Sequence, residues 1–130
     1  MNIVADTNVI VAALRSGKGA SHRLLQMVRR GEFVTLHLSA AVVLEYEEVL
    51  LRELVPALAS RQEITAFLDD LILVSVCHAQ IAAWRPLSTD PDDDSLLELA
   101  LTADVDRLVT FNKVHLQPAV DMGIDLLTPS

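Results

Sequence analysis

The chain has 130 residues, a length that suits one domain, so we expect a single domain over residues 1–130. Apolar residues make up 52% of the sequence, enough for a sizeable core. Lys and Arg number 10 against 18 Asp and Glu, giving a formal net charge of -8, which argues against broad, charge-driven binding to nucleic-acid backbones. A nucleic-acid enzyme with this balance needs metal ions, a local basic patch or a basic partner.

The start of the chain and its cysteine content favour a cytoplasmic protein. The opening MNIVADTNVI has no basic segment ahead of an apolar one and does not predict a signal peptide. No apolar run approaches the roughly 18 residues that a membrane helix needs, so no membrane association is expected. Cys77 is the single cysteine and cannot form an intrachain disulfide.

Short β-branched runs alternate with longer helical patterns along the chain. The short runs predict five strands, at Asn2–Ala5, Phe33–Leu38, Leu73–Val76, Arg107–Thr110 and Ile124–Leu127. The helical patterns predict helices at Thr7–Leu14, Ala20–Arg30, residues 40–54, residues 61–71, His78–Trp84, residues 89–103 and Gln117–Met122.

Several residues fit the ends of these helices. Gly31 is expected to stop the second helix, while Ser39 and Ser60 are expected to cap the two that follow. His37, inside the second predicted strand, is expected to have a structural role.

The alternation of strands and helices predicts the fold class. Parallel strands need crossover connections, which helices provide, so we expect a three-layer α/β/α sandwich around a parallel sheet. In such sheets the ligand site lies at the carboxyl ends of the strands. The polar residues that follow the predicted strands are therefore the functional candidates.

Asp6 follows the first predicted strand, within the sequence VADTN. A single Asp at a strand-to-helix junction is also a common helix cap. Asp6 is therefore explained about equally well as a functional residue and as a helix cap. Asn8 has the same two interpretations and is the weaker candidate, so we consider it a supporting residue.

Two glutamates compete for a role in the helix that follows the second strand. Glu45 falls on one border of the apolar stripe of this helix and Glu47 falls on the other, whereas Glu48 points away. A solvated helix flank explains either residue. Periodicity therefore does not choose between Glu45 and Glu47.

The densest acidic feature is the run Asp90-Pro91-Asp92-Asp93-Asp94. Asp90 suits a helix cap, Pro91 the first helical position, and the later acids would complement the helix dipole. Asp93 shares a face with Leu97 and Ala100, at spacings of four and seven residues, and that face should pack on the sheet. Asp93 is therefore expected to point toward the carboxyl edge, with Asp90 in a supporting position.

Thr110 and Asn112 lie in the sequence VTFNK, where the fourth predicted strand ends. Both stand where strand-end ligands belong, although a turn capped by Asn112 would explain them equally well.

The combination of these segments points to a metal site. Asp6, a glutamate of the third helix and Asp93 would bring three carboxylates to one crevice, and carboxylates that lie so close repel one another. Divalent cations relieve this repulsion, and oxygen-only ligands suit Mg²⁺ or Mn²⁺ rather than zinc. Such ions can activate water and polarise a phosphodiester.

Four blocks of the sequence, in order, resemble the PIN-domain family. They are NIVADTNVIVAAL, SAAVVLEYEEVL, DPDDDSLLELAL and LVTFNKVHL, and the resemblance covers Asn2 to Leu127. It selects Glu45 over Glu47 and matches Asp6 and Asp93 to the family's aspartates. Many members carry Thr-x-Asp in the fourth block. Here Asn112 stands at that aspartate, which weakens the case for a second metal ion beside the one we expect.

The third and fourth blocks look most like the VapC-like branch, the toxins of toxin–antitoxin pairs. This resemblance implies a five-stranded parallel sheet and Mg²⁺- or Mn²⁺-dependent cleavage of single-stranded or structured RNA, which leaves 3′-hydroxyl and 5′-phosphate ends. It also implies an antitoxin partner and a homodimer. Asp6, Glu45, Asp93 and Asn112 would be the catalytic residues, and the three acids would hold the metal.

Other residues are candidates for contacts with RNA or protein. Arg15, Lys18 and Lys113 would lie near the site and could bind phosphates, and no aromatic platform for bases is evident. The mean hydropathy of +0.38 is high for so small a protein. Apolar residues that continue around more than one face of a helix would fit a dimer or antitoxin contact, namely Leu50, Leu51, Leu54, Val55 and Leu58.

Three other classes of protein compete with the nuclease interpretation. A haloacid-dehalogenase-type phosphoryl-transfer enzyme would need an aspartate at position 8, which is Asn. A receiver-like signalling domain would need adjacent acids near the start and a lysine after a late strand, which Lys113 matches poorly. A non-catalytic PIN-like binding module of RNA or protein remains the alternative if Asn112 disables the metal site.

Overall fold

Five parallel strands form one central sheet in the computed structural model of the protein, which describes residues 1–79, 91–113, 116–121 and 123–129, and only the backbone of residues 91–94. The strands are β1 (Asn2–Ala5), β2 (Thr35–Ser39), β3 (Val76–His78), β4 (Arg107–Val109) and β5 (Asp125–Leu127). Their order is β3-β2-β1-β4-β5, and every neighbouring pair is parallel. The central strand β1 is therefore buried along Ile3, Val4 and Ala5.

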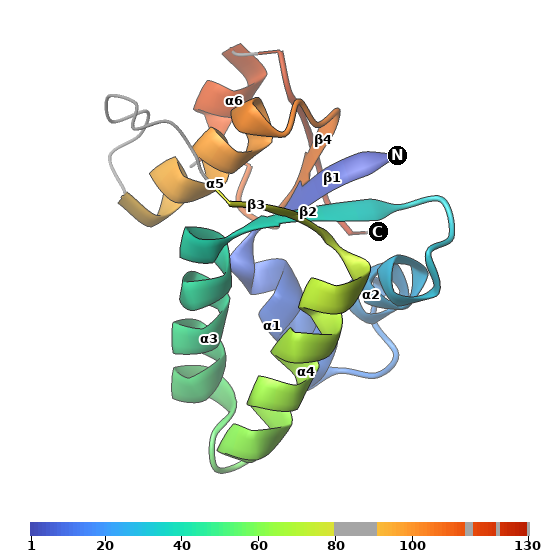
Figure 1. Ribbon diagram of the computed structural model, residues 1–130, viewed down its shortest axis with the longest axis vertical. Helices are drawn as coiled ribbons and strands as arrows, with labels where there is room; N and C mark the ends of the chain where they lie inside the picture. The colour runs from blue at the N-terminus through green and yellow to red at the C-terminus, as the bar shows by residue number, and fades with distance from the viewer. Residues whose placement is uncertain (80–90, 114–115, 122, 130) are drawn as a thin grey trace.

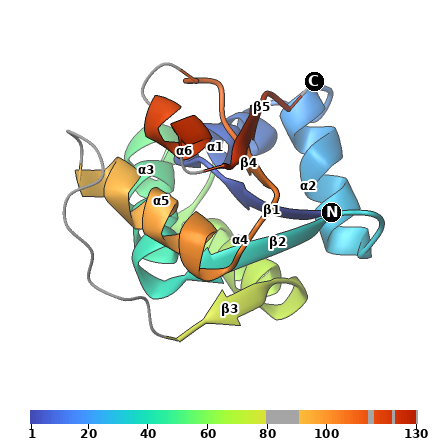
Figure 2. The same cartoon turned by 90° about the horizontal axis from the view of Figure 1, so that it is seen from above.

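Helices cover both faces of the sheet. They are α1 (Thr7–Arg15), α2 (Ala20–Arg30), α3 (Ala40–Leu54), α4 (Arg61–Val74), α5 (Pro91–Thr102) and α6 (Gln117–Asp121). Helices α1 to α4 lie on one side of the sheet, and α5 and α6 lie on the other (Figure 1). The view from above shows α5 and α6 over the sheet (Figure 2). The predicted three-layer α/β/α sandwich is thus confirmed. Within the described ranges, no helix is both long and apolar enough to cross a membrane.

Local sequence sets several helix ends as predicted. Gly31 ends α2 with φ of 69°, a left-handed conformation that glycine adopts without strain, and its N–H donates to carbonyls of the last turn. Ser39 caps α3 by accepting a hydrogen bond from the backbone N–H of Val42 at 3.2 Å. Ser60 and Glu63 form a reciprocal capping box at the start of α4.

The boundary between α4 and β3 differs from the prediction. The predicted strand at Leu73–Val76 is wrong for its first residues, because α4 continues to Val74. Ser75 closes that helix, and its hydroxyl donates to the carbonyl of Leu71 at 2.6 Å. Strand pairing with β2 begins only at Val76, opposite His37. Leu73 is 82% exposed, so a short apolar run here did not mark a buried strand.

The segment after β3 was also predicted differently. His78 is the last residue of β3 rather than the first of a helix, because it pairs in register with Ser39 of β2. The rest of that predicted helix, from residue 80 to Trp84, lies outside the described residues.

Most of the exposed apolar side chains are not the ones that the sequence in and after α3 predicted. Of the five residues that would leave an exposed remainder, Leu58 is exposed, whereas the other four are buried or pack partly buried against the core. Exposed apolar side chains occur instead at the end of α4 and on the edge strand β3, at Ile72, Leu73, Val74 and Val76.

His37 joins three strands at the face of the sheet, which agrees with the structural role predicted for it. It is buried, and its Nε2 donates to Oδ1 of Asn2 at 3.0 Å. Its Nδ1 then accepts from Nε2 of His78 at 3.0 Å, and the two rings stack with centroids 5.3 Å apart. Burial, and secondly the neighbouring His78, lower the pKa of His37 below its usual 6.5.

This arrangement predicts a pH dependence of stability. Below pH 6.5 the unfolded chain binds a proton at His37 more readily than the folded chain does, so the free energy of unfolding should fall as the pH drops from about 6.5 toward the folded pKa. Urea unfolding of the protein and of its His37→Gln variant between pH 5 and 8 measures this. The variant should show a flatter dependence over that window, and identical slopes would contradict the prediction.

Candidate functional site

Asp6 is fixed at the carboxyl end of the central strand. Its backbone N–H donates to the carbonyl of Val109 on β4 at 2.8 Å. Its Oδ1 accepts from the backbone N–H of Thr7 at 2.8 Å, and its Oδ2 accepts from the hydroxyl of Thr110 at 2.7 Å. Asp6 is therefore the cap of α1, and it also presents an oriented carboxylate at the edge where ligand sites form.

Thr110 links Asp6 to the loop that follows β4. The residue is fully buried, and its hydroxyl also accepts from the backbone N–H of Asn112 at 2.9 Å. Its own N–H donates to the carbonyl of Leu127 on β5 at 2.8 Å. The turn around Asn112 is thus held against Asp6 by a single hydroxyl, and the exposed Asn112 side chain faces the same cavity as Asp6.

Tyr46 anchors α3 to the end of β1. Its side chain is fully buried, and its hydroxyl donates to the carbonyl of Ala5 at 2.5 Å. Burial raises the pKa of Tyr46 far above its usual range, and the negative charges of Asp6 and then Glu45 raise it further. The carboxylates of Asp6 and Glu45 therefore both lie in the surroundings of this one phenol.

The structure separates the two glutamates that periodicity left equivalent. Glu45 is half-buried and close enough to Tyr46 for its charge to affect the phenol, whereas Glu47 is exposed. Glu45 also precedes Val49 and Glu53 by one and two helical turns, and those two residues line the cavity beside Asp6. The charges of Asp6 and Glu45 thus act on the same buried phenol.

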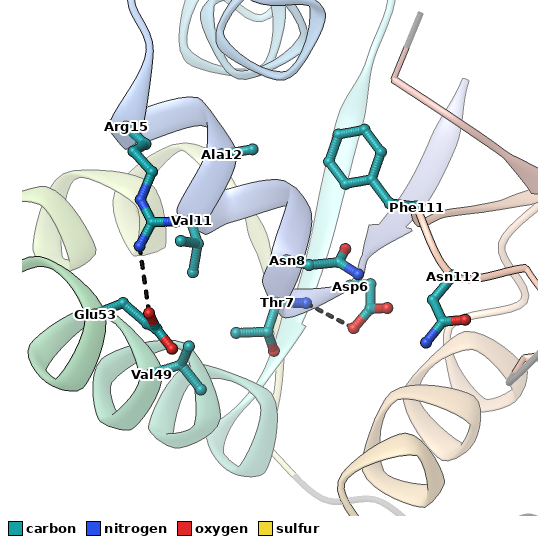
Figure 3. Close-up of a pocket in the computed structure, with 10 residues that line it drawn as sticks. All are labelled: Asp6, Thr7, Asn8, Val11, Ala12, Arg15, Val49, Glu53, Phe111 and Asn112. Atoms are coloured by element: carbon teal, nitrogen blue, oxygen red, sulfur yellow. Dashed lines mark hydrogen bonds and ion pairs between the residues drawn. The ribbon is translucent and has the colours of Figure 1, made fainter.

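A cavity of about 470 Å³ opens beside Asp6, between α1 and α3 (Figure 3). From α1 it is lined by residues that recur at helical spacing, and α3 and the loop after β4 provide the remainder. The lining residues are Asp6, Thr7, Asn8, Val11, Ala12, Arg15, Val49, Glu53, Phe111 and Asn112. Sequence reasoning had selected four of these residues, Asp6, Asn8, Arg15 and Asn112.

Two features of the cavity were not predicted. Glu53 forms an ion pair with Arg15 at 3.3 Å, so Arg15 lies in the cavity as expected but has an acidic partner. Phe111 lines the cavity with 52% of its surface exposed, although no aromatic platform was evident from the sequence. The sequence did contain one indication for Glu53, because it lies four residues, about one helical turn, after Val49. The position of Phe111 beside Thr110 was the signal for the ring.

Other predicted residues lie apart from the cavity or outside the description. Lys18 and Lys113 are exposed and do not belong to the cavity lining. Asp90 lies outside the described residues. Asp93 belongs to the first turn of α5, whose side chains there are not described, and α5 contacts both β1 and α3.

The oxygen donors at the cavity suit a hard divalent cation. Asp6 and Asn112 offer a carboxylate and an amide oxygen there, which are ligands that Mg²⁺ and Mn²⁺ prefer. Two hydrogen bonds fix the orientation of the Asp6 carboxylate. Among the described side chains, which exclude Asp93, no group of three or more His, Cys, Asp and Glu residues could hold a metal.

The sequence matches the family model of the PIN domain over residues 2–114. The chain therefore belongs to the PIN-domain family, as its four sequence blocks predicted. PIN domains generally use divalent metal ions, which agrees with the oxygen donors around Asp6.

One solved structure shares the fold over almost the whole chain. It is the crystal structure of VapBC2 from Rickettsia felis bound to a DNA fragment from their promoter, with a TM-score of 0.65 and 14% sequence identity. The match covers 98% of this chain and 98% of that chain. Among curated proteins, no sequence matches this one.

The hydroxyl of Thr110 can be removed without a change of shape. Thr110→Val deprives Oδ2 of Asp6 and the N–H of Asn112 of this partner in a buried position, so the free energy of unfolding should fall by about 1–3 kcal/mol. Thr110→Ser, which keeps the hydroxyl, is the control. Chemical denaturation of both variants gives the difference, and equal stabilities would show that the hydroxyl does not hold the loop.

Proposed function

We propose that this protein is a metal-dependent ribonuclease that hydrolyses RNA phosphodiester bonds, and that it is the toxin of a toxin–antitoxin pair in the cytoplasm. The observation that carries the proposal is the carboxylate of Asp6, which Thr7 and Thr110 orient beside a cavity at the carboxyl end of the central strand. Membership of the PIN-domain family supports the same chemistry.

Asp6, Glu45 and Asp93 would hold one Mg²⁺ or Mn²⁺ ion. Such an ion, when bound, supplies Lewis-acid activation of water and of the scissile phosphodiester. The protein contributes orientation: Thr7 and Thr110 fix both oxygens of the Asp6 carboxylate. Asn112 is neutral, so it would orient water or donate a carbonyl oxygen rather than add the charge that a second ion needs.

The groove between α1 and α3 would guide the RNA. Asn8 and Arg15 lie in its lining, and the guanidinium of Arg15 is half exposed and can bind a phosphate when Glu53 releases it. Lys18 and Lys113 would act further out, as surface charges that attract the strand. Because the net charge of the protein is -8, attraction of the RNA phosphates would depend on these few basic side chains and on the bound metal ion.

An antitoxin and a second copy of the chain are the proposed protein partners. The shared fold with a VapBC2 structure supports the first of these. The exposed apolar side chains at the end of α4 and on β3 are suited to a protein contact, because a monomer gains nothing from leaving Leu73 82% exposed. An antitoxin or homodimer interface there would bury them.

A PIN-like binding module is the second candidate function, and the neutral side chain of Asn112 favours it. Such a module would bind RNA or protein without cutting. Calorimetric titration with Mn²⁺ separates the two functions: binding that disappears in Asp6→Asn supports the nuclease, and no binding supports the module.

Loss of the Asp6 charge should abolish cleavage. Asp6→Asn keeps the size of the side chain but removes the carboxylate that would hold the metal, so cleavage of a single-stranded RNA should fall at least a hundredfold. Chelation by EDTA should have the same effect on the unaltered protein, and added Mg²⁺ or Mn²⁺ should restore it. Unchanged activity in either experiment would refute the proposal.

The two neighbouring glutamates provide a matched pair. Glu45→Gln should lower cleavage more than tenfold, because Glu45 is half-buried and its charge acts on the same phenol as that of Asp6, whereas Glu47 is exposed and Glu47→Gln should leave cleavage within about twofold. Both variants remove the same charge from the same helix, so an overall change in net charge affects them alike. A larger loss in Glu47→Gln would exclude the assignment of Glu45.

A further inference from the structure

The polarity of the residues that line the cavity beside Asp6 differs from one end to the other. At one end it has the carboxylate of Asp6 with Asn8 and Asn112, and at the other the ion pair of Arg15 and Glu53. Helix α1 runs between these ends, and its first and last residues, Thr7 and Arg15, lie about 12 Å apart along the helix axis at a rise of 1.5 Å per residue. That length exceeds what one phosphate group occupies.

The middle of the cavity is apolar. Val11 and Ala12 of α1 and Val49 of α3 line it there, and none of the three can donate or accept a hydrogen bond through its side chain. A phosphate or sugar hydroxyl would lose its water in this section without a replacement partner. A flat, weakly solvated group such as a nucleobase fits it better.

Phe111 adds an open aromatic face at the Asp6 end of the cavity. Its neighbours in sequence are fixed, because the hydroxyl of Thr110 is hydrogen-bonded to Asp6 and the N–H of Asn112 is hydrogen-bonded to Thr110. The ring is nevertheless 52% exposed, and in the close-up it lies above Asn8 and Asp6 (Figure 3). A rigid backbone that presents an exposed ring next to a carboxylate site is an arrangement that suits stacking.

We propose that Phe111 is a substrate-contact residue that stacks on the base of the nucleotide flanking the scissile phosphate, so that the cavity between α1 and α3 is a nucleobase subsite for single-stranded RNA. This inference rests on the proposed nuclease function. Single strands expose the faces of their bases, and stacking on an aromatic side chain tolerates every base because each has a π-face. Paired bases cannot reach the ring, so the subsite would select unpaired RNA.

The test combines a change in the protein with a change in the RNA. The cleaved bond is first mapped on an end-labelled single-stranded RNA, and oligonucleotides are then made with an abasic residue on either side of it. Phe111→Ala should lower kcat/KM for intact RNA about tenfold, whereas Phe111→Trp should retain activity. One of the two abasic substrates should lower kcat/KM of the unaltered protein by a similar factor and cause no further loss in Phe111→Ala.

Phe33→Ala is the matched control. Phe33 is also exposed, at 82%, but it precedes β2 at the opposite end of the sheet, where its carbonyl accepts from the amino group of Met1. This variant should cleave intact and abasic RNA as the unaltered protein does. Thermal unfolding of all three variants identifies any loss that comes from folding.

The possible outcomes are distinct. If the unaltered protein cleaves no RNA, the proposed function fails and the subsite fails with it. If it cleaves RNA but Phe111→Ala is equally active, or if the losses from Phe111→Ala and from the abasic residue simply multiply, only the stacking role is overturned. Unchanged cleavage together with an altered mass in light scattering would assign the ring to a protein contact instead, which also overturns it.

Discussion

The hydrogen bond from Tyr46 to the carbonyl of Ala5 is the constraint on which the site depends. A buried phenol without a partner would cost about 1–3 kcal/mol, so α3 can pack against β1 only in the register that brings the hydroxyl to this carbonyl. Glu45 precedes Tyr46 and Asp6 follows Ala5, so this one contact in the core links the backbone positions of two partly buried acidic residues. Burial, and then the charges of Asp6 and Glu45, raise the pKa of the phenol and keep it protonated.

The surroundings of Asp6 show how a small acidic protein can tolerate such a site. Like charges that approach one another destabilise the folded state, and each needs compensation. Here two neutral donors, the N–H of Thr7 and the hydroxyl of Thr110, contribute to this compensation at Asp6. The cation Arg15 is instead committed to Glu53 at the far end of the groove. A strongly basic residue beside Asp6 would compete with a metal ion for the same oxygens.

Much of the architecture was predictable because it follows from local rules. The run Asn2–Ala5, the glycine stop at Gly31 and the Ser39 cap each depend on a few neighbouring residues, and all three are as predicted. The end of α4 was not predictable, since the apolar run Leu73–Val76 fits a strand as well as a helix and only pairing with β2 decides. Glu53 and Phe111 line the cavity because α1, α3 and the loop after β4 meet there, and their spacing from Val49 and Thr110 was only a weak local signal of this. The side chain of Asp93 remains a prediction.

Asp6 and Thr110 lie 104 residues apart in the chain, yet a single hydrogen bond joins them. The backbone of Thr110 is held in turn by Leu127 on the last strand. During synthesis on a ribosome, the aspartate is therefore made 104 residues before the threonine that holds its carboxylate. Contacts of such long range also form late in folding, because they must overcome the entropy of closing a large loop. The order of translation thus delays the orientation of the Asp6 carboxylate until Thr110 and the strand that supports it have been made.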